Sequence, residues 1–458
     1  MTRRRDLWAL AGVVVLVESV AVRLVNAVAY PPLFGFDAIA NWRYIDGLTK
    51  DWTLPAPDAD WSTAHPPLFY YLAALLVRAA RGLCGAEAVG EAAGAVMVRL
   101  AVSTVGVAAA LWAARAVAQR EGGSRRETLV LGALLLVPAH VMLSAMVSEE
   151  VLAASLSTVA LVLALRALDG ADAGTADRRA LACGAVAGLA ALTKLSGALV
   201  VPAAVLAFAA QGLPGAVPGA ARRGLRRAAL CALAAGLVGG WYYLRNLALY
   251  GYFYPQSLST HAVMLAMPPG ERGLADYLWL PLATWTRNSV IDPALLHSVW
   301  GGTFATLWFD GHRKFLPLAD ERVRLAGTAV LALALVPTAA FAAGFVRGLG
   351  RALRARSSRD LLLCAHLGLT LAGYALFSWR NPWFATIKGS FLLGTGLPAA
   401  LYSAQEFERW LARGPRLRRV LLVWAVVWAL AVGLVFTWGL VFAKQDFAGV
   451  KWTPQLPR

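Results

Sequence analysis

The segment RRRDLWALAGVVVLVESVAVRLVNAV, residues 3–28, decides the fold class of this chain. Three arginines precede an apolar run that is long enough, as a helix, to cross a hydrocarbon layer about 30 Å thick. The run has no A-x-A cleavage pattern, so we interpret it as an uncleaved first membrane helix and not as a signal peptide. Its arginines are expected on the cytoplasmic side.

The composition of the whole chain agrees with a membrane protein. Of its 458 residues, 59% are hydrophobic and only 15% are charged, with a mean hydropathy of +0.59, whereas soluble domains carry about 25% charged residues. The net charge of +17 arises from short basic clusters between apolar runs, which indicates topology signals and argues against a nucleic-acid partner. The four cysteines have neither paired nor Cys/His spacing, so no disulfide framework and no zinc site is expected.

Apolar runs recur along the chain and predict about eleven membrane helices. The positive-inside rule requires an even number of crossings between successive cytoplasmic basic clusters. One of the three runs between Arg5 and Arg120 therefore cannot cross, and we select 66–83, which we expect to lie as an amphipathic helix in the outer interface. The predicted spans are 7–28, 95–118, 128–146, 148–168, 180–193, 196–211, 228–246, 323–346, 360–379, 384–404 and 420–442.

This count predicts an all-α integral membrane protein in which residues 1–458 form one transmembrane domain with a cytoplasmic N-terminus. The long connections 29–94 and 247–322 then both face the non-cytoplasmic side, and the first contains juxtamembrane helices. A site is expected on that face, because long ordered loops often carry function. No separate soluble C-terminal domain is expected, and no internal repeat supports a transporter built from inverted halves.

Acidic residues stand at the predicted outer ends of helices. Asp37 follows the first span, and Glu149 and Glu150 lie where two later spans meet. Carboxylates at membrane depth suggest function because they are costly there, and two acidic positions at one cavity suit general-base chemistry on an acceptor hydroxyl. The alternatives are an N-cap role for Asp37 and, for the glutamates, a solvated pair stabilised by the helix dipole.

Basic residues recur on the same predicted face. Lys194 lies in a tight turn between two runs, and Arg245 and Lys388 lie near the outer ends of spans. A buried cation in a membrane turn calls for an anion, and phosphate is the candidate; the alternative for Lys194 and Arg245 is snorkelling to lipid headgroups. The acidic triplet from Asp58 to Asp60 has metal-motif spacing, which leaves a divalent cation open although none is required.

Taken in order, these motifs resemble the GT-C glycosyltransferases, and among them the protein O-mannosyltransferase and aminoarabinose transferase group (glycosyltransferase families 39 and 83). The resemblance covers residues 5–255, and the remainder matches only by hydropathy. In two departures, Ala38 follows the first-loop aspartate where many relatives have glutamate, and Lys388 stands near the place where many have an Arg-Tyr pair. The matching motifs are Asp37, His65-Pro66-Pro67-Leu68-Phe69-Tyr70-Tyr71, Leu192-Thr193-Lys194, and Arg245-Asn246 followed by Tyr250-Gly251.

The resemblance implies an enzyme that takes a sugar from a polyprenyl-phosphate donor, with Asp37 as general base and inversion at the anomeric carbon. The acceptor is a hydroxyl of a glycan, lipid or protein, and the site faces the non-cytoplasmic side of the plasma membrane, in contact with membrane lipid. A polytopic transporter or lipid flippase for a glycolipid is the alternative. The expected catalytic residues are Asp37 and Glu150, and the expected substrate-binding residues are His65, Lys194, Arg245, Glu149, Tyr70, Asn246 and Lys388.

Overall fold

A computed structural model describes residues 2–85, 88–121, 123–170, 172–212, 219–254, 272–280, 298–316 and 321–442. Within these ranges the chain is helical, without β-strands. Seven helices are long and apolar enough to cross a membrane, or eight if the bent pair α5 (Gly123–Leu135) and α6 (Pro138–Ser144) forms one span. The all-α, multi-pass membrane architecture is thus confirmed, and the eleven crossings stay a prediction.

The long helices carry most of the predicted spans. They are α1 (Thr2–Ala29), α4 (Glu91–Glu121), α7 (Glu150–Leu168), α15 (Glu321–Arg354), α16 (Ser358–Arg380), α18 (Pro415–Phe436), and α10 (Ala220–Ala235), which continues through the π-helical turn η3 (Gly236–Gly240) into α11 (Trp241–Tyr250). The remaining elements are α2 (Ala38–Lys50), α3 (Leu68–Cys84), α8 (Ala173–Thr193), η1 (Leu195–Leu199), α9 (Val200–Ala209), η2 (Ala210–Gly212), α13 (Ala275–Leu278), α14 (Val299–Trp308), η6 (Phe384–Thr386), η7 (Gly389–Thr395) and α17 (Gly396–Ala412).

The predicted run 384–404 is not one helix. The 3₁₀ turns η6 and η7 occupy its first half, and the α-helix begins only at Gly396. Gly389 explains the detour, because a Cβ there would come within 2.5 Å of Leu307 Cα. Only glycine lets this segment lie directly against the backbone of α14, and the apolar pattern does not reveal that contact. The run 66–83 is helical as α3 but is not among the seven spanning candidates.

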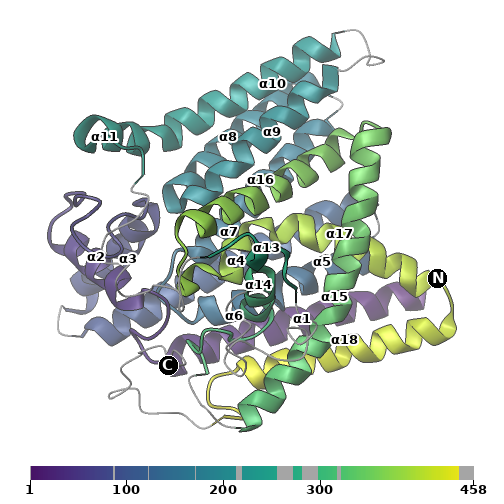
Figure 1. Ribbon diagram of the computed structural model, residues 1–458, viewed down its shortest axis with the longest axis horizontal. Helices are drawn as coiled ribbons and strands as arrows, with labels where there is room; N and C mark the ends of the chain where they lie inside the picture. The colour runs from purple at the N-terminus through teal and green to yellow at the C-terminus, as the bar shows by residue number, and fades with distance from the viewer. Residues whose placement is uncertain are drawn as a thin grey trace.

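Tight packing joins the spans into one bundle. In Figure 1, α8, α9 and α10 lie together along the upper edge, and α1, α15 and α18 lie below them, with α4, α5, α7 and α17 between. The crossing of α8 and α10 is close, since a Cβ on Gly184 would lie 2.1 Å from the Cys231 carbonyl oxygen. Alanine-rich helices pack well at such short range because small side chains allow backbones to approach.

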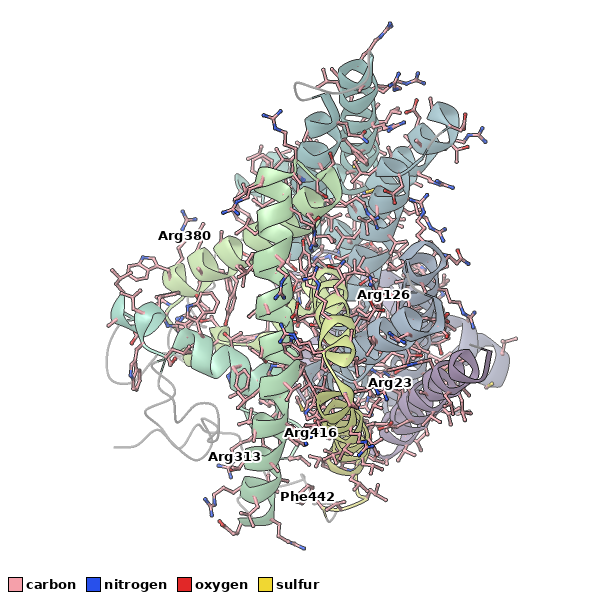
Figure 2. The ribbon with its side chains drawn as sticks, turned by 90° about the vertical axis from the view of Figure 1, so that its right-hand side faces the viewer. Arg23, Arg126, Arg313, Arg380, Arg416 and Phe442 are labelled. Atoms are coloured by element: carbon pink, nitrogen blue, oxygen red, sulfur yellow. The ribbon has the colours of Figure 1, made fainter. Side chains whose placement is uncertain are left out.

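The basic clusters meet at one end of this bundle. Asp169, just after α7, forms ion pairs with Arg120 from the end of α4 and with Arg359 from the start of α16. Arg126 of α5 pairs with Glu408 of α17, and Figure 2 labels Arg126 among the packed helices. Clusters that are far apart in the sequence therefore share one end, as the positive-inside argument requires of cytoplasmic loops.

The first loop lies at the other end. Figure 1 shows α2, α3 and α11 together at the left edge, and the N-terminus at the right. Much of the second predicted loop, 247–322, and the chain after residue 442 lie outside the described residues.

Candidate active site

Asp37 lies at the junction between α1 and α2, in a strained backbone conformation. Its φ is 52°, in the left-handed region that non-glycine residues seldom adopt. It occupies the N-cap position of α2 but its side chain makes no capping hydrogen bond. Instead, Trp61 Nε1 donates to Asp37 Oδ1 at 2.9 Å. The carboxylate is thus held toward the loop by the indole, and the N-cap alternative does not describe it.

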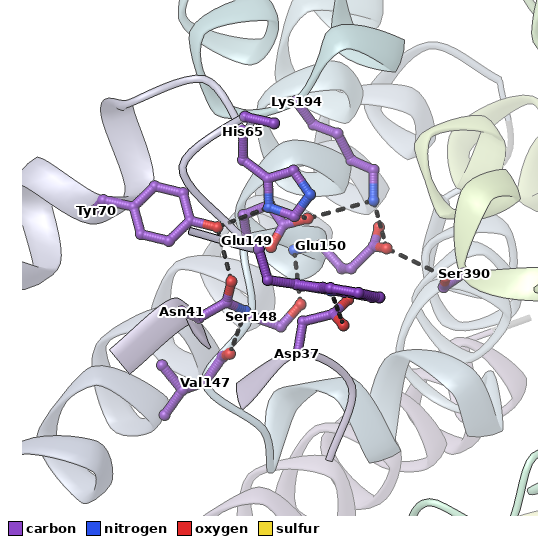
Figure 3. Close-up of polar contacts among 12 residues, drawn as sticks. Asp37, Asn41, His65, Tyr70, Val147, Ser148, Glu149, Glu150, Lys194 and Ser390 are labelled. Carbon is purple, nitrogen blue, oxygen red and sulfur yellow. Dashed lines mark hydrogen bonds and ion pairs between the residues drawn. The ribbon is translucent and has the colours of Figure 1, made fainter. Parts of the chain in front are cut away.

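A chain of hydrogen bonds ties His65 to the start of α7 (Figure 3). The Tyr70 hydroxyl donates to Asn41 Oδ1 at 2.8 Å, and Asn41 Nδ2 donates to the Val147 carbonyl at 2.8 Å. The remaining contact, His65 Nδ1 to the Tyr70 oxygen at 2.8 Å, must then have the histidine as donor. The other ring nitrogen, Nε2, stays available for a ligand.

The two glutamates enclose Lys194. Its Nζ lies 3.4 Å from Glu149 Oε1 and forms a closer ion pair with Glu150 Oε1, which also accepts from Ser390 Oγ at 3.1 Å. Burial lowers the pKa of Lys194, but Glu150 and Glu149 outweigh it and hold the pKa above its usual value. Burial raises the pKa of Glu149, but His65 and Lys194 hold it below its usual value. Lys194 and Glu149 are therefore charged at neutral pH.

Two further lysines face Asp37. The Lys388 ammonium lies over the Phe36 ring, 4.5 Å from its centroid. Although burial raises the pKa of Asp37, the charges of Lys388, His65 and Lys314 and the Trp61 hydrogen bond together keep it below its usual value. Burial and the neighbouring Lys388 lower the pKa of Lys314 to about 8. The surroundings of Asp37 are thus cationic.

The loop that carries Lys314 is shaped by a buried aspartate. Asp310 accepts hydrogen bonds from the backbone N–H groups of Lys314 and Phe315 at 2.8 and 2.7 Å, and from that of Leu316. Tyr30, at the end of α1, donates to the Lys314 carbonyl. The second outer loop is thereby fastened beside the first.

Arg245 and Asn246 lie to one side of these groups. Arg245 donates to the Leu54 carbonyl at 3.4 Å and to Asn246 Oδ1 at 3.2 Å. Within the described part of the chain, no hydrogen bond or ion pair joins it to Asp37 or to the two glutamates. Its positive charge partly offsets the rise that burial causes in the pKa of Tyr44 and of Tyr71. The guanidinium therefore lies near these tyrosines of α2 and α3.

The predicted residues thus fall into two groups. The structure brings Asp37, His65, Tyr70, Glu149, Glu150, Lys194 and Lys388 together, and it leaves Arg245 and Asn246 beside them. The sequence reasoning missed Trp61, Ser390, Asn41 and Lys314. One available signal concerned Lys314: a basic pair, Arg313-Lys314, on a predicted outer loop runs against the positive-inside rule.

A divalent cation does not fit these residues. Among the described residues, no group of three or more His, Cys, Asp or Glu side chains is placed to hold a metal ion. The Lys194 ammonium already lies between Glu149 and Glu150. Asp60 is engaged by the Trp61 backbone N–H at 2.7 Å, so the acidic triplet does not form a ligand set either.

Comparison with solved structures identifies the fold. An oligosaccharyltransferase from Archaeoglobus fulgidus, crystallised with Zn and sulfate, matches with a TM-score of 0.58 at 16% identity, over 93% of this chain and 53% of that one. The archaeal oligosaccharyltransferase AglB from Archaeoglobus fulgidus, in complex with an inhibitory peptide and a dolichol-phosphate, matches with a TM-score of 0.55 at 14% identity, over 96% of this chain and 56% of that one. The chain has the GT-C fold and spans about half the length of the oligosaccharyltransferase.

Other comparisons add little. ArnT from Cupriavidus metallidurans bound to undecaprenyl phosphate gives a TM-score of 0.42 at 18% identity, over 87% of this chain and 78% of that one, and the fold assignment rests on the oligosaccharyltransferase. No protein-family model matches the sequence, and no curated protein does.

Proposed function

We propose that this chain is a membrane glycosyltransferase that moves a sugar from a polyprenyl-phosphate donor to a hydroxyl acceptor. The observation that carries the proposal is the setting of Asp37, an ionised carboxylate in a strained loop, held by Trp61 and faced by Lys388 and Lys314. The GT-C fold supports the reaction class, and the dolichol-phosphate bound to the archaeal oligosaccharyltransferase supports the donor class.

In the proposed reaction, Asp37 accepts the proton of the acceptor hydroxyl as the hydroxyl oxygen bonds to the anomeric carbon. The bond between that carbon and the phosphate oxygen breaks, and the phosphate leaves as an anion. A single displacement inverts the anomeric centre. Because the leaving group is already anionic, the protein mainly orients the reactants and stabilises the charge on the phosphate.

We assign the leaving phosphate to the cations beside Asp37. Lys388 and Lys314 carry most of this role, and His65 Nε2 donates to the phosphate only when both ring nitrogens carry a proton. Lys194 already forms ion pairs with Glu149 and Glu150. We therefore propose that it serves as their counter-ion and keeps the start of α7 in place. Glu150 then acts through Lys194 and Ser390 and does not touch the reacting atoms. Arg245 is left for the outer part of the donor or for a lipid headgroup.

We further propose that the site faces the non-cytoplasmic side of the plasma membrane. The support is the separation between the basic clusters, joined through Asp169 at one end of the bundle, and the Asp37 loop at the other. The archaeal enzyme was crystallised with Zn, but here Lys194 supplies positive charge between the acidic residues. No step of the proposed reaction passes through a metal.

The test uses the full chain in lipid nanodiscs with a panel of polyprenyl-phosphate sugars, and measures release of polyprenyl phosphate in the presence of delipidated cell-envelope extract as acceptor. Asp37→Asn is expected to lower turnover by about 10²- to 10⁴-fold, the usual contribution of a general base, with donor binding retained. Glu91→Gln, which neutralises an exposed acid at the start of α4, is the matched control. Undiminished turnover by Asp37→Asn would remove the assignment.

A further inference from the structure

Three arginines are buried without a carboxylate. Arg99, Arg23 and Arg272 are only 0%, 2% and 6% exposed, and no ion pair joins any of them to an acidic side chain of the described residues. Each also has a buried Nε without a hydrogen-bond partner. Removing a guanidinium from water is costly, so each needs a reason to be there.

The first of them, Arg99 of α4, donates to backbone carbonyls at the end of α1. Its Nη1 reaches the carbonyls of Tyr30 at 2.8 Å and Ala27 at 3.4 Å, and its Nη2 that of Pro31 at 2.5 Å. Prolines 31 and 32 have no N–H, so they cannot close the last turn of the helix. Of the two carbonyls that these prolines leave without a donor four residues on, Arg99 reaches that of Ala27, and its charge suits the negative end of a helix dipole.

The second, Arg272, does the same at the end of α16. Its Nη1 donates to the Ser378 carbonyl at 2.7 Å, and its Nη2 to the Trp383 carbonyl at 2.9 Å. The regular partner of the Ser378 carbonyl would be the N–H of residue 382, which is Pro382 and has none. Again an arginine stands in for a missing proline donor.

The third, Arg23 of α1, which Figure 2 labels, acts where α5 breaks. α5 and α6 are bent by 59° at a break that Pro138 follows. Arg23 Nη2 donates to the Leu135 carbonyl at 2.9 Å and contacts His140 Nδ1 at 2.8 Å. Because an arginine only donates, that histidine nitrogen is the acceptor.

Each of these helix ends leads directly into the candidate site. α1 leads into the loop of Asp37, α16 into the turns of Lys388 and Ser390, and α5 leads through α6 into Glu149 and Glu150. We propose that Arg99, Arg272 and Arg23 are positioning residues that set these three segments by donating to backbone carbonyls at helix ends that lie next to prolines. None of the three touches the reacting atoms. The kinetic part of this inference rests on the proposed function, and the structural part does not.

The test compares Arg99→Met with Arg99→Lys. Methionine keeps much of the side-chain volume but donates no hydrogen bond, and lysine keeps the charge but lacks the planar set of N–H donors of the guanidinium. Without the hydrogen bonds from Arg99 to the end of α1, Asp37 can move away from Lys388 and His65, so the pKa of Asp37 rises. In Arg99→Met we expect kcat/KM to fall by about 100-fold, the scale of a 1 Å misplacement, and its acidic limb to move to higher pH. Arg99→Lys should recover part of both.

Arg126→Met is the control, because Arg126 is also buried but pairs with Glu408 at the opposite end of the bundle. It should lower Tm and leave the acidic limb unmoved. An Arg99→Met protein with wild-type kcat/KM and an unmoved limb would overturn the inference. If Arg99→Met does not fold, Arg99→Lys carries the same test.

A wild-type chain that transfers no sugar would overturn the proposed function alone. The inference is then decided by a cryo-EM structure of Arg99→Met. Loss of the Trp61–Asp37 hydrogen bond with α1 and α4 intact supports it, and an unchanged bond overturns it.

Discussion

At the scale of single residues, the site is governed by how charges are shared. Lys194 was predicted as a phosphate ligand, but its ammonium lies against Glu149 and Glu150, with a side chain only 16% exposed. The charges of Lys388 and Lys314 act on Asp37, and Lys314 is also near the carboxylate of Asp310. We therefore expect Lys194 to matter for stability and the other two lysines for donor binding.

Lys194→Met tests this division. Removing one partner of a buried ion pair leaves uncompensated charge, so we expect a loss of about 3–5 kcal/mol of stability, measured as a lower midpoint of thermal inactivation in detergent. The double variant Lys194→Met/Glu150→Gln should regain part of the loss, because one negative charge is removed with the positive one. Lys50→Met, which breaks an exposed pair with Asp46, should change stability by less than about 1 kcal/mol. Equal stability of wild type and Lys194→Met would contradict the counter-ion role.

Lys314 predicts an alkaline limit to donor binding. Its pKa is lowered to about 8, so its ammonium is present below that pH and is lost as pH rises through it. Affinity for a polyprenyl phosphate should fall above about pH 8, as titrated by a fluorescent lipid-binding assay. In Lys314→Arg the limit should move to higher pH, because a guanidinium stays protonated. Lys50→Arg, at an exposed lysine, should leave the alkaline limit of binding unchanged. If the limit in Lys314→Arg stays where it is in the wild type, another group is responsible for it.

At the scale of elements, the orientation of α8 and α10 depends on glycine. α8 ends at Lys194, and α10 continues into α11 with Arg245, so their crossing sets the distance between the two cationic groups. The backbones touch where a side chain would collide, at Gly184 against the Cys231 carbonyl.

Gly184→Ala should force these helices apart. Overpacking of this kind costs about 1–3 kcal/mol, visible as a lower thermal midpoint. Gly132→Ala is the matched control, because nothing lies within 4 Å of a Cβ at that position of α5, and alanine is the better helix former. If both variants behave alike, the close crossing does not contribute to stability.

At the scale of the whole molecule, the orientation in the membrane can be read from a native cysteine. Cys84, at the end of α3, is exposed, and the other three cysteines are buried. α3 lies at the end of the bundle that holds the Asp37 loop. A membrane-impermeant maleimide added to intact spheroplasts should therefore label the wild-type protein but not Cys84→Ser. Labelling that appears only after permeabilisation would mean that this end faces the cytoplasm.

Much of the architecture could be predicted from the order of residues. Apolar runs of membrane length located the long helices, and arginine clusters indicated which ends belong together, as the pairing of Asp169 with Arg120 and Arg359 bears out. The prediction of one helix over 384–404 was wrong, because the first half of this segment is bent where Gly389 lies against α14. Asp37 was singled out because Glu149, Glu150 and several cations were predicted on the same face, and its catalytic role stays a prediction.

What the sequence by itself determined is the class of molecule, a helical membrane protein with acidic and basic residues at the ends of its helices, because hydropathy and charge act locally and can be counted along the chain. Tertiary structure decided which charges meet. Lys194 could have faced a ligand or a glutamate, and the basic pair Arg313-Lys314 did not reveal that Lys314 meets Asp37. The partner of a charge lies far along the chain and is decided by helix packing. The same holds for Arg99, Arg23 and Arg272, since each donates to backbone carbonyls at the end of another helix.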